Sequence, residues 1–377
     1  MRRRLEFESY EQVRDRARRV MPPVLFEDML HGTGRSVTAR ANETAFDQVE
    51  LVPRAAVGWP ERSLSATVLG AEVSMPVLVS PVGALRLVHP EGAPGAVAAA
   101  GKAGTVAGVS MMAGHGPAEV APRASGPVWQ QVYLSHGYDR CAQVIGQAKR
   151  YGFQAVAVTV DCPVSPKKPV GLKVSASAAL KFGPQLVRRP GWTARFLRDG
   201  ASLAAANAAL GPRLKQTALW SDMGWLKEQW EGPLVVKGIV TAADARRAVD
   251  SGADAIVVSN HGGMSLDGAP ATLSVLPGIV AEVGREVEVY LDGGVREGSD
   301  VLRALAMGAR AVMIGRPMLF GLAVGGSAGV AGVLEMFRHQ LEVALAMVGA
   351  RAVQDLDATF VRTPAHWQSA APAAVVT

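Results

Sequence analysis

The chain has 377 residues, of which 49% are hydrophobic and 19% charged, so it can bury a large core and a mostly ordered chain is predicted between its ends. The formal net charge of +6 comes mostly from basic residues interleaved with acidic ones, and no nucleic-acid partner is predicted. No apolar run follows the basic start or approaches the length of a membrane span, which predicts a cytoplasmic protein.

Short β-branched runs alternate with alanine-rich segments of helical period after about residue 70, the pattern of repeated βα units. Residues 1–70 are expected to form an N-terminal helical cap. Eight strands are predicted, at 76–80, 106–110, 128–133, 155–160, 234–237, 255–259, 288–292 and 311–314. The predicted helices include 91–103, 140–151, 242–251, 299–307 and 330–348. Thr241 and Ser299 are the expected N-caps of two of them, and Gly252 and Gly308 their expected ends.

Eight βα units predict an α/β fold, a closed (β/α)8 TIM barrel in a single domain over residues 1–377. An open doubly wound sheet is the alternative, but Ser80-Pro-Val-Gly-Ala-Leu after the first strand lacks the G-x-G-x-x-G pattern. Residues 161–220 then form a long insertion after the fourth strand. Within it, residues 167–198 carry eight Lys or Arg and no acidic residue. We expect a solvated or partly disordered loop there, with a docking surface as the alternative.

Polar residues end several apolar runs, and in such a barrel these ends form the active site. They are Ser110, Gln131, Tyr133, Thr159, Asp161, Lys237, Ser259, His261, Asp292 and Arg316. His261 is the candidate base because imidazole titrates nearest neutral pH, and Asp161 would orient it and favour its charged form. Lys237 is interpreted as a fixed positive charge rather than a Schiff-base nucleophile.

The last two strands end in LDGGVREGSD and MIGRPMLFGL. Glycines let backbone amides approach an anion, and Arg296 and Arg316 add charge, so a phosphorylated ligand is predicted. No His, Cys and Asp residues have metal-ligand spacing, and no metal site is predicted. The two cysteines, Cys141 and Cys162, are too few for a disulfide framework, and the sequence gives little reason to assign either a thiol role.

Several motifs together resemble the FMN-dependent α-hydroxy-acid oxidases and dehydrogenases, which include glycolate oxidase, lactate oxidase and mandelate dehydrogenase. The motifs are SNHGGMSLDGAPAT, LDGGVREGSDVLRALAMGARAVMIGRP, HPEG at 89–92, LVVKGIVTAADA at 234–245 and TVD at 159–161. The similarity extends from about residue 10 to about residue 360. It implies FMN as cofactor, a small-molecule substrate, oxygen or another carrier as electron acceptor, and a homotetramer.

The resemblance also implies roles for individual residues. The implied cofactor-binding residues are Pro81, Val82, Gly83, Ser110, Gln131, Thr159, Lys237, Ser259, His261, Gly262, Asp292, Gly293, Gly294, Arg296, Gly315 and Arg316. In catalysis, His261 would take a proton from the substrate while two electrons reach FMN, and Asp161 would stabilise the imidazolium. Lys237 would stabilise the reduced flavin, and Tyr133 would contact the substrate.

Three expected substrate-pocket residues depart from the family pattern. Met264 stands where family members have an arginine that binds the substrate carboxylate, Lys168 aligns with a second arginine, and Phe26 aligns with a tyrosine. Losing a bidentate arginine leaves a buried carboxylate unpaired, whereas methionine and phenylalanine form a larger apolar surface. We therefore expect a bulkier substrate from natural-product or peptide chemistry. The mycofactocin-pathway flavoenzymes, a related branch, also lack this arginine and oxidise a peptide-derived amine.

Three alternatives stay open at this point. The chain could be an ordinary 2-hydroxy-acid oxidase in which Lys168 binds the carboxylate, a non-catalytic FMN-binding scaffold, or a barrel isomerase without flavin. The intact set of His261, Asp161 and Lys237 favours an enzyme. Gly83 occupies a position that varies between oxidases and dehydrogenases, so the electron acceptor is left open.

Overall fold

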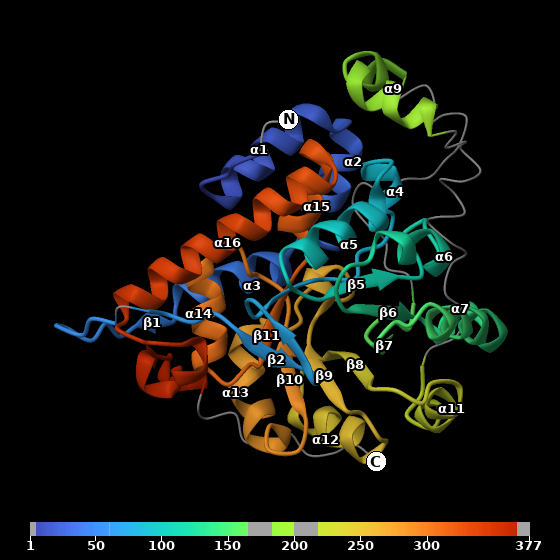
Figure 1. Cartoon of the computed structure of the whole chain (residues 1–377). Coiled ribbons are helices and arrows are strands. Elements are labelled where there is room, and N and C mark those ends of the chain that lie inside the picture. Colours follow the sequence, from blue (N-terminus) through green and yellow to red (C-terminus); the bar gives the residue numbers. More distant parts are fainter. Residues whose placement is uncertain (1–4, 60, 165–182, 200–217, 368–377) are drawn as a thin grey trace.

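A closed barrel of eight parallel strands forms the centre of the molecule, with the strand order β10-β11-β4-β5-β6-β7-β8-β9 (Figure 1). The computed structural model describes residues 5–59, 61–164, 183–199 and 218–367. The barrel strands are β4 (Val77–Val79), β5 (Ala107–Ser110), β6 (Val128–Val132), β7 (Ala155–Thr159), β8 (Leu234–Ile239), β9 (Ala255–Val258), β10 (Glu288–Leu291) and β11 (Ala311–Ile314). The predicted barrel and its eight strands are confirmed.

The strands are buried on both faces because side chains fill the barrel and helices cover its outside. Leu78, Trp129, Tyr290 and Met313 belong to the inner core, and the neighbours of Leu78, Tyr290 and Met313 along their strands belong to the outer core. The register sets polar strand ends side by side: Ser110 pairs with Gln131, and Thr159 with Lys237. The barrel thereby brings distant segments to one end.

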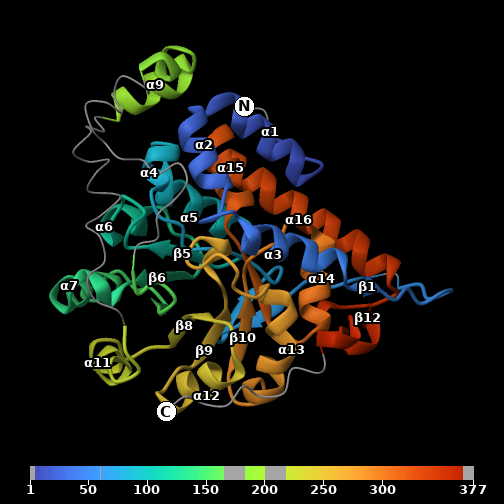
Figure 2. The same ribbon diagram turned by 180° about the vertical axis from the view of Figure 1, so that it is seen from behind.

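Helices surround the barrel (Figures 1 and 2). They are α4 (Leu85–Val88), α5 (Gly92–Lys102), α6 (Pro117–Val120), α7 (Tyr138–Arg150), α11 (Asp222–Gln229), α12 (Ala242–Asp250), α13 (Thr272–Val283), α14 (Gly298–Ala306), α15 (Arg316–Gly325) and α16 (Ser327–Met347). Short 3-10 helices are η1 (Ala121–Arg123), η2 (Leu134–His136), η3 (His261–Gly263), η4 (Val353–Asp355), η5 (Ala358–Phe360) and η6 (Ala365–Trp367). None of the described helices is both long and apolar enough to cross a membrane.

The two predicted N-caps had different outcomes. Thr241 caps α12, because its Oγ1 accepts a hydrogen bond from the Asp244 backbone N–H at 3.1 Å. Ser299 does not cap α14, which begins one residue earlier with Glu297 as N-cap. There Asp300 accepts from the backbone N–H groups of Arg296 and Glu297, at 2.9 and 3.1 Å, so its carboxylate takes the capping role.

The N-terminal cap contains helices α1 (Tyr10–Val20), α2 (Pro23–Leu30) and α3 (Val37–Asp47). It is not helical throughout. A hairpin of β2 (Ala66–Val68) and β3 (Ala71–Val73) follows, and Val68 and Val73 pack onto the inner barrel core. Burial of one face of this short alternating segment against the barrel favours a strand over a helix. Before this hairpin in the chain, β1 (Glu50–Leu51) pairs with the late strand β12 (Val361–Arg362).

The described part of the basic insertion is a docked helix, α9 (Pro190–Arg198). Trp192 Nε1 donates to the Leu87 carbonyl at 3.2 Å, and Arg189 Nε donates to the Met21 carbonyl at 3.0 Å. Next to α9, Asp199 forms an ion pair with Arg86 at 2.9 Å. Residues 183–198 are therefore not a loop throughout, since they contain α9, but none of them is buried, so the expected solvent exposure is borne out. Residues 165–182 lie outside the described residues.

Candidate active site

The C-terminal ends of the strands border a cavity of about 320 Å³. Most predicted site residues line it: Pro81, Val82, Gly83, Tyr133, Thr159, Lys237, His261, Gly262, Met264, Asp292, Gly293, Gly294, Arg296, Gly315 and Arg316. Ser110, Gln131 and Ser259 are buried and do not line it. The barrel therefore gathers these residues at one end, as the (β/α)8 architecture requires.

A chain of buried hydrogen bonds crosses three strand ends. The Ser110 hydroxyl donates to Gln131 Oε1 at 2.7 Å, and Gln131 Nε2 donates to Thr159 Oγ1 at 2.9 Å. These two hydrogen bonds fix the orientation of the Gln131 side-chain amide. The amide in turn holds Thr159 Oγ1, and Thr159 lines the cavity. A rigid polar wall of this kind can hold the edge of a heteroaromatic cofactor.

Lys237 is a buried positive charge with two partners. Its Nζ lies 2.7 Å from Asp292 Oδ2 and donates to Ser259 Oγ at 2.6 Å. Burial alone would lower the pKa of Lys237, but the carboxylates of Asp292 and Asp161 more than offset this and raise it. Lys237 therefore stays protonated at neutral pH, which suits a fixed charge and not a Schiff-base nucleophile.

The turn that carries His261 has a strained backbone and a firm anchor. His261 follows β9 in η3 with a φ of +58°, a left-handed conformation that is uncommon for residues other than glycine. Asn260 and Asn42 exchange two side-chain hydrogen bonds, both 2.8 Å long and both buried. Asn260 Oδ1 also accepts from the Gly263 backbone N–H at 3.2 Å. These bonds hold the histidine in place, and sequence reasoning did not identify them.

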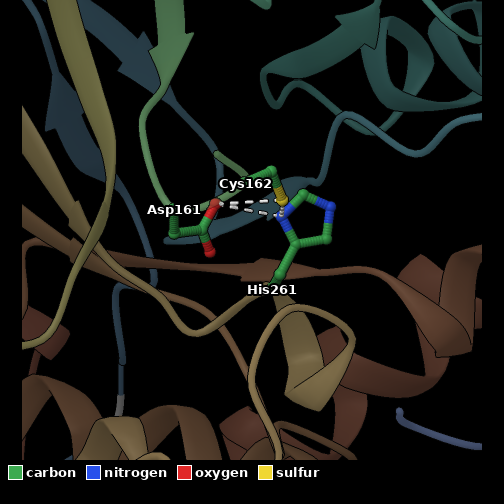
Figure 3. A group of neighbouring side chains, drawn as sticks. All are labelled: Asp161, Cys162 and His261. Carbon is green, nitrogen blue, oxygen red and sulfur yellow. Dashed lines mark hydrogen bonds and ion pairs between the residues drawn. The ribbon is translucent and has the colours of Figure 1, made fainter. Parts of the chain in front are cut away.

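The His261 ring is held through its two nitrogens (Figure 3). Its Nδ1 lies 3.1 Å from Asp161 Oδ1, and its Nε2 lies 3.4 Å from the Tyr133 hydroxyl. Burial alone would lower the pKa of His261, but the Asp161 carboxylate and the Cys162 sulfur offset this and raise it to about 10. For Asp161, burial acts to raise the pKa, yet His261 and Lys237 lower it overall. The predicted pair of base and carboxylate is thus in contact.

Cys162 is a third member of this cluster that the sequence did not reveal. Its Sγ lies 3.3 Å from His261 Nδ1 (Figure 3). The same Sγ lies 3.1 Å from Ser265 Oγ. Side-chain atoms of Asp161, Cys162 and His261 all lie within 4.8 Å of one another, although His261 is about a hundred residues away in sequence. In the sequence, the only indication of this role was that Cys162 directly follows Asp161. The contact between Cys162 and His261 forms only when the barrel closes.

Two buried guanidiniums at another side of the cavity fit a phosphorylated cofactor. Arg316 donates to the carbonyls of Met29 at 3.1 Å and Gly262 at 3.0 Å, and Arg296 donates to Glu43 at 2.7 Å. Burial and the nearby Arg296 charge lower the pKa of Arg316 to about 10. Among the described residues, Arg316 Nη2 and Arg296 Nε have no hydrogen-bond partner. An anion such as phosphate would satisfy both donors and relieve their repulsion.

Glycine is required beside these arginines by close packing. Gly294 has a φ of +89°, and a Cβ there would lie 2.1 Å from the Asn42 carbonyl oxygen. The motif Asp292-Gly-Gly therefore lets the backbone of α3 approach the cavity wall, besides leaving room for a ligand. The donors, the glycines and the neighbouring polar wall together suit a flavin mononucleotide.

The expected substrate residues differ in where they lie. Met264 lines the cavity, whereas Phe26 is 1% exposed and stacks on Phe320 with ring centroids 5.2 Å apart. Phe26 is therefore not a lining residue, because α2 turns its ring into the core beneath α15. Lys168 lies outside the described residues. Lining residues that sequence reasoning missed are Asp28, Met29, Ser80, Ala84, Met112, His136, Cys162, Val164, Val295, Met313 and Leu319.

Comparison with known proteins agrees with this site. The FMN-dependent dehydrogenase family pattern matches residues 17–363. The chain is 37% identical to a pre-mycofactocin synthase of Mycobacterium tuberculosis, over 95% of each chain, and 36% identical to an L-lactate oxidase of Nostoc sp., over 94% of this chain and 96% of the other. A crystal structure of the monotopic membrane protein (S)-mandelate dehydrogenase superposes with a TM-score of 0.88 at 29% identity, over 96% of this chain and 100% of the other. The chain therefore belongs to the FMN-dependent dehydrogenase family and is an FMN-dependent oxidoreductase of the hydroxy-acid oxidase type.

Proposed function

We propose that this enzyme oxidises a CH–OH or CH–NH centre in a substrate that has no free carboxylate beside the reacting carbon. Such a substrate is bulkier than lactate and comes from natural-product or peptide chemistry. The observation that carries the proposal is Met264, a thioether that lines the cavity one helical turn after His261. FMN, when bound, supplies the acceptor for the two electrons that leave the substrate.

His261 is the base in this proposal. Its Nδ1 is occupied by Asp161, so Nε2 is the nitrogen that can receive the substrate proton. Asp161 stabilises the imidazolium that forms, since the carboxylate favours the charged ring. Tyr133, whose pKa burial raises well above its ordinary value, stays protonated and can donate a hydrogen bond to the substrate oxygen or nitrogen.

Lys237 and the two arginines hold the cofactor in this proposal. The paired and buried Lys237 provides a fixed positive charge near the isoalloxazine edge. Arg296 and Arg316 bind the phosphate through the donors that have no partner among the described residues. Both guanidiniums that line the cavity are then committed to the cofactor, which leaves neither for a substrate carboxylate.

The substrate side is built from soft, apolar groups. Val164 lines the cavity with Met264. A substrate carboxylate beside them would lose its hydration without gaining a bidentate partner. Thioethers adapt their shape to a large apolar group, which suits a bulky substrate.

A matched pair of probes tests the substrate proposal. Anaerobic stopped-flow measurements would compare flavin reduction by mandelate and by mandelamide, which differ in the carboxylate alone. We expect the neutral amide to reduce the flavin faster than the acid in the native enzyme. The variant Met264→Arg should reverse this preference, with a change of about a hundredfold in the ratio of the two rates. Faster reduction by mandelate in the native enzyme would refute the proposal.

The 36% identity to an L-lactate oxidase supports a second candidate, ordinary 2-hydroxy-acid oxidation with Lys168 binding the carboxylate. In that case glycolate, lactate or mandelate would bleach the flavin rapidly, and Lys168→Ala would raise the substrate concentration needed for half-maximal reduction. Lys168→Ala should have little effect if the first candidate is right.

The homotetramer and the cytoplasmic location stay predictions. Sedimentation velocity of the purified protein checks the homotetramer.

A further inference from the structure

Cys162 places a thiol beside the candidate base. Its side chain lines the cavity, and its Sγ lies 3.3 Å from His261 Nδ1 and 3.6 Å from Asp161 Oδ1 (Figure 3). The proposed oxidation does not use this thiol, because Asp161 already orients His261 Nδ1. A nucleophilic atom, a proton acceptor and an open cavity therefore coincide without an assigned purpose.

The other cysteine of the chain provides an internal contrast. Cys141 is fully buried on α7, and its Sγ donates to the Tyr133 carbonyl at 3.1 Å. Burial raises the pKa of Cys141 to about 11, so its thiol stays protonated and inaccessible. The two thiols differ in access and in the basic partner, which are the two properties that control cysteine reactivity.

The arrangement differs from a Cys-His-Asp triad. In a triad the nucleophile and the carboxylate contact opposite nitrogens of the histidine, whereas Cys162 and Asp161 both contact Nδ1. A protonated Nδ1 then faces two acceptors, and its positive charge stabilises a thiolate at Cys162. Because both groups contact Nδ1, the unmodified Cys162 does not block a substrate from Nε2.

We propose that Cys162 is a nucleophilic thiol that forms a covalent adduct with carbon electrophiles small enough to enter the substrate cavity. In this step the S–H bond breaks and its proton passes to water, while the protonated His261 Nδ1 faces the sulfur and stabilises its negative charge. The sulfur electron pair forms a new S–C bond, and the leaving group, such as iodide, departs with the electrons of its bond to carbon. No oxidant is required. The adduct occupies the space beside the imidazole and blocks the substrate from the base.

Iodoacetamide labelling of the FMN-loaded protein tests this proposal. At pH 7, peptide mass spectrometry should show Cys162 carbamidomethylated at least about tenfold faster than Cys141 in the same molecules. The variant His261→Gln should slow labelling of Cys162 about tenfold, because the thiolate loses the positive charge that stabilises it. Cys162→Ser should remove rapid labelling of the native protein. The flavin absorbance should persist in labelled protein, which shows that the adduct forms with the cofactor bound.

Two outcomes would overturn the proposal: Cys162 reacting no faster than Cys141, or Cys162 in folded His261→Gln reacting as fast as in the native protein. Should His261→Gln fail to fold, the pH profile of native labelling decides. A rate that stays above that of a free model thiol below pH 7 supports activation, and a rate that tracks the model thiol at every pH refutes it. Labelling is read without turnover, so a protein that labels rapidly but oxidises no substrate would refute the proposed function alone.

Discussion

The two segments that hold His261 differ in chemistry. On one side, the turn after β9 is anchored to α3 by neutral hydrogen bonds between Asn42 and Asn260, both buried. On the other side, the segment after β7 presents Asp161 and Cys162, groups that carry or can gain negative charge, to the ring nitrogen. Neutral bonds fix position with little effect on proton affinity, whereas the carboxylate changes proton affinity strongly. The first segment therefore sets where the imidazole lies, and the second sets its protonation.

Removing the imidazole should have the largest effect. In His261→Gln the proton acceptor is lost, and we expect the rate constant of anaerobic flavin reduction by mandelamide to fall about a thousandfold. FMN should remain bound, because the lysine and arginine contacts are untouched; the flavin absorption spectrum checks this. Reduction at the native rate in a variant that retains FMN would show that His261 is not the base.

Changing the charged segment should alter the pH dependence. The base must be unprotonated to accept a proton, so the flavin reduction rate should rise with pH as His261, with a pKa raised to about 10, loses its proton. Asp161→Asn removes the carboxylate that raises this pKa, and the rising limb should move to lower pH by more than one unit. The maximal rate should also fall, by about tenfold to a hundredfold, since the imidazolium is less stabilised. An unmoved limb would contradict the assigned role of Asp161.

Changing the neutral segment should have the smallest effect on the reaction and a distinct signature. Asn42→Ala leaves Asn260 with unsatisfied buried groups and should lower the free energy of unfolding by about 1–3 kcal/mol, measured in urea. Flavin reduction should slow a few-fold, with its pH limb unchanged. The double variant with Asn260→Ala should be less destabilised than the sum of the two single variants, because the groups contact each other. A shifted pH limb in Asn42→Ala would erase the distinction between the two segments.

Local pattern was sufficient for the barrel and for much of the site. The strands were predictable because buried parallel strands are short, apolar and β-branched, and the motifs after β9, β10 and β11 identified the polar ends. Lys237 lies near the end of β8, Asp292 directly follows β10, and Arg316 follows β11 after one glycine, so barrel geometry brings them to one cavity. Two local features were less predictable. The end of the cap forms the β2–β3 hairpin because one face of it packs on the barrel, and the Asp300 carboxylate rather than Ser299 caps α14.

The sequence by itself determined which residues lie at the strand ends, and with them the histidine, its carboxylate partner and the two arginines proposed to bind phosphate. The tertiary structure alone decided that Cys162 contacts His261, that Asn42 anchors Asn260 across 218 positions, and that Phe26 faces the core instead of the cavity. The physical reason is that strand periodicity is a local property of the chain. Contacts between segments that are a hundred or more residues apart arise when the barrel closes and the cap docks on it.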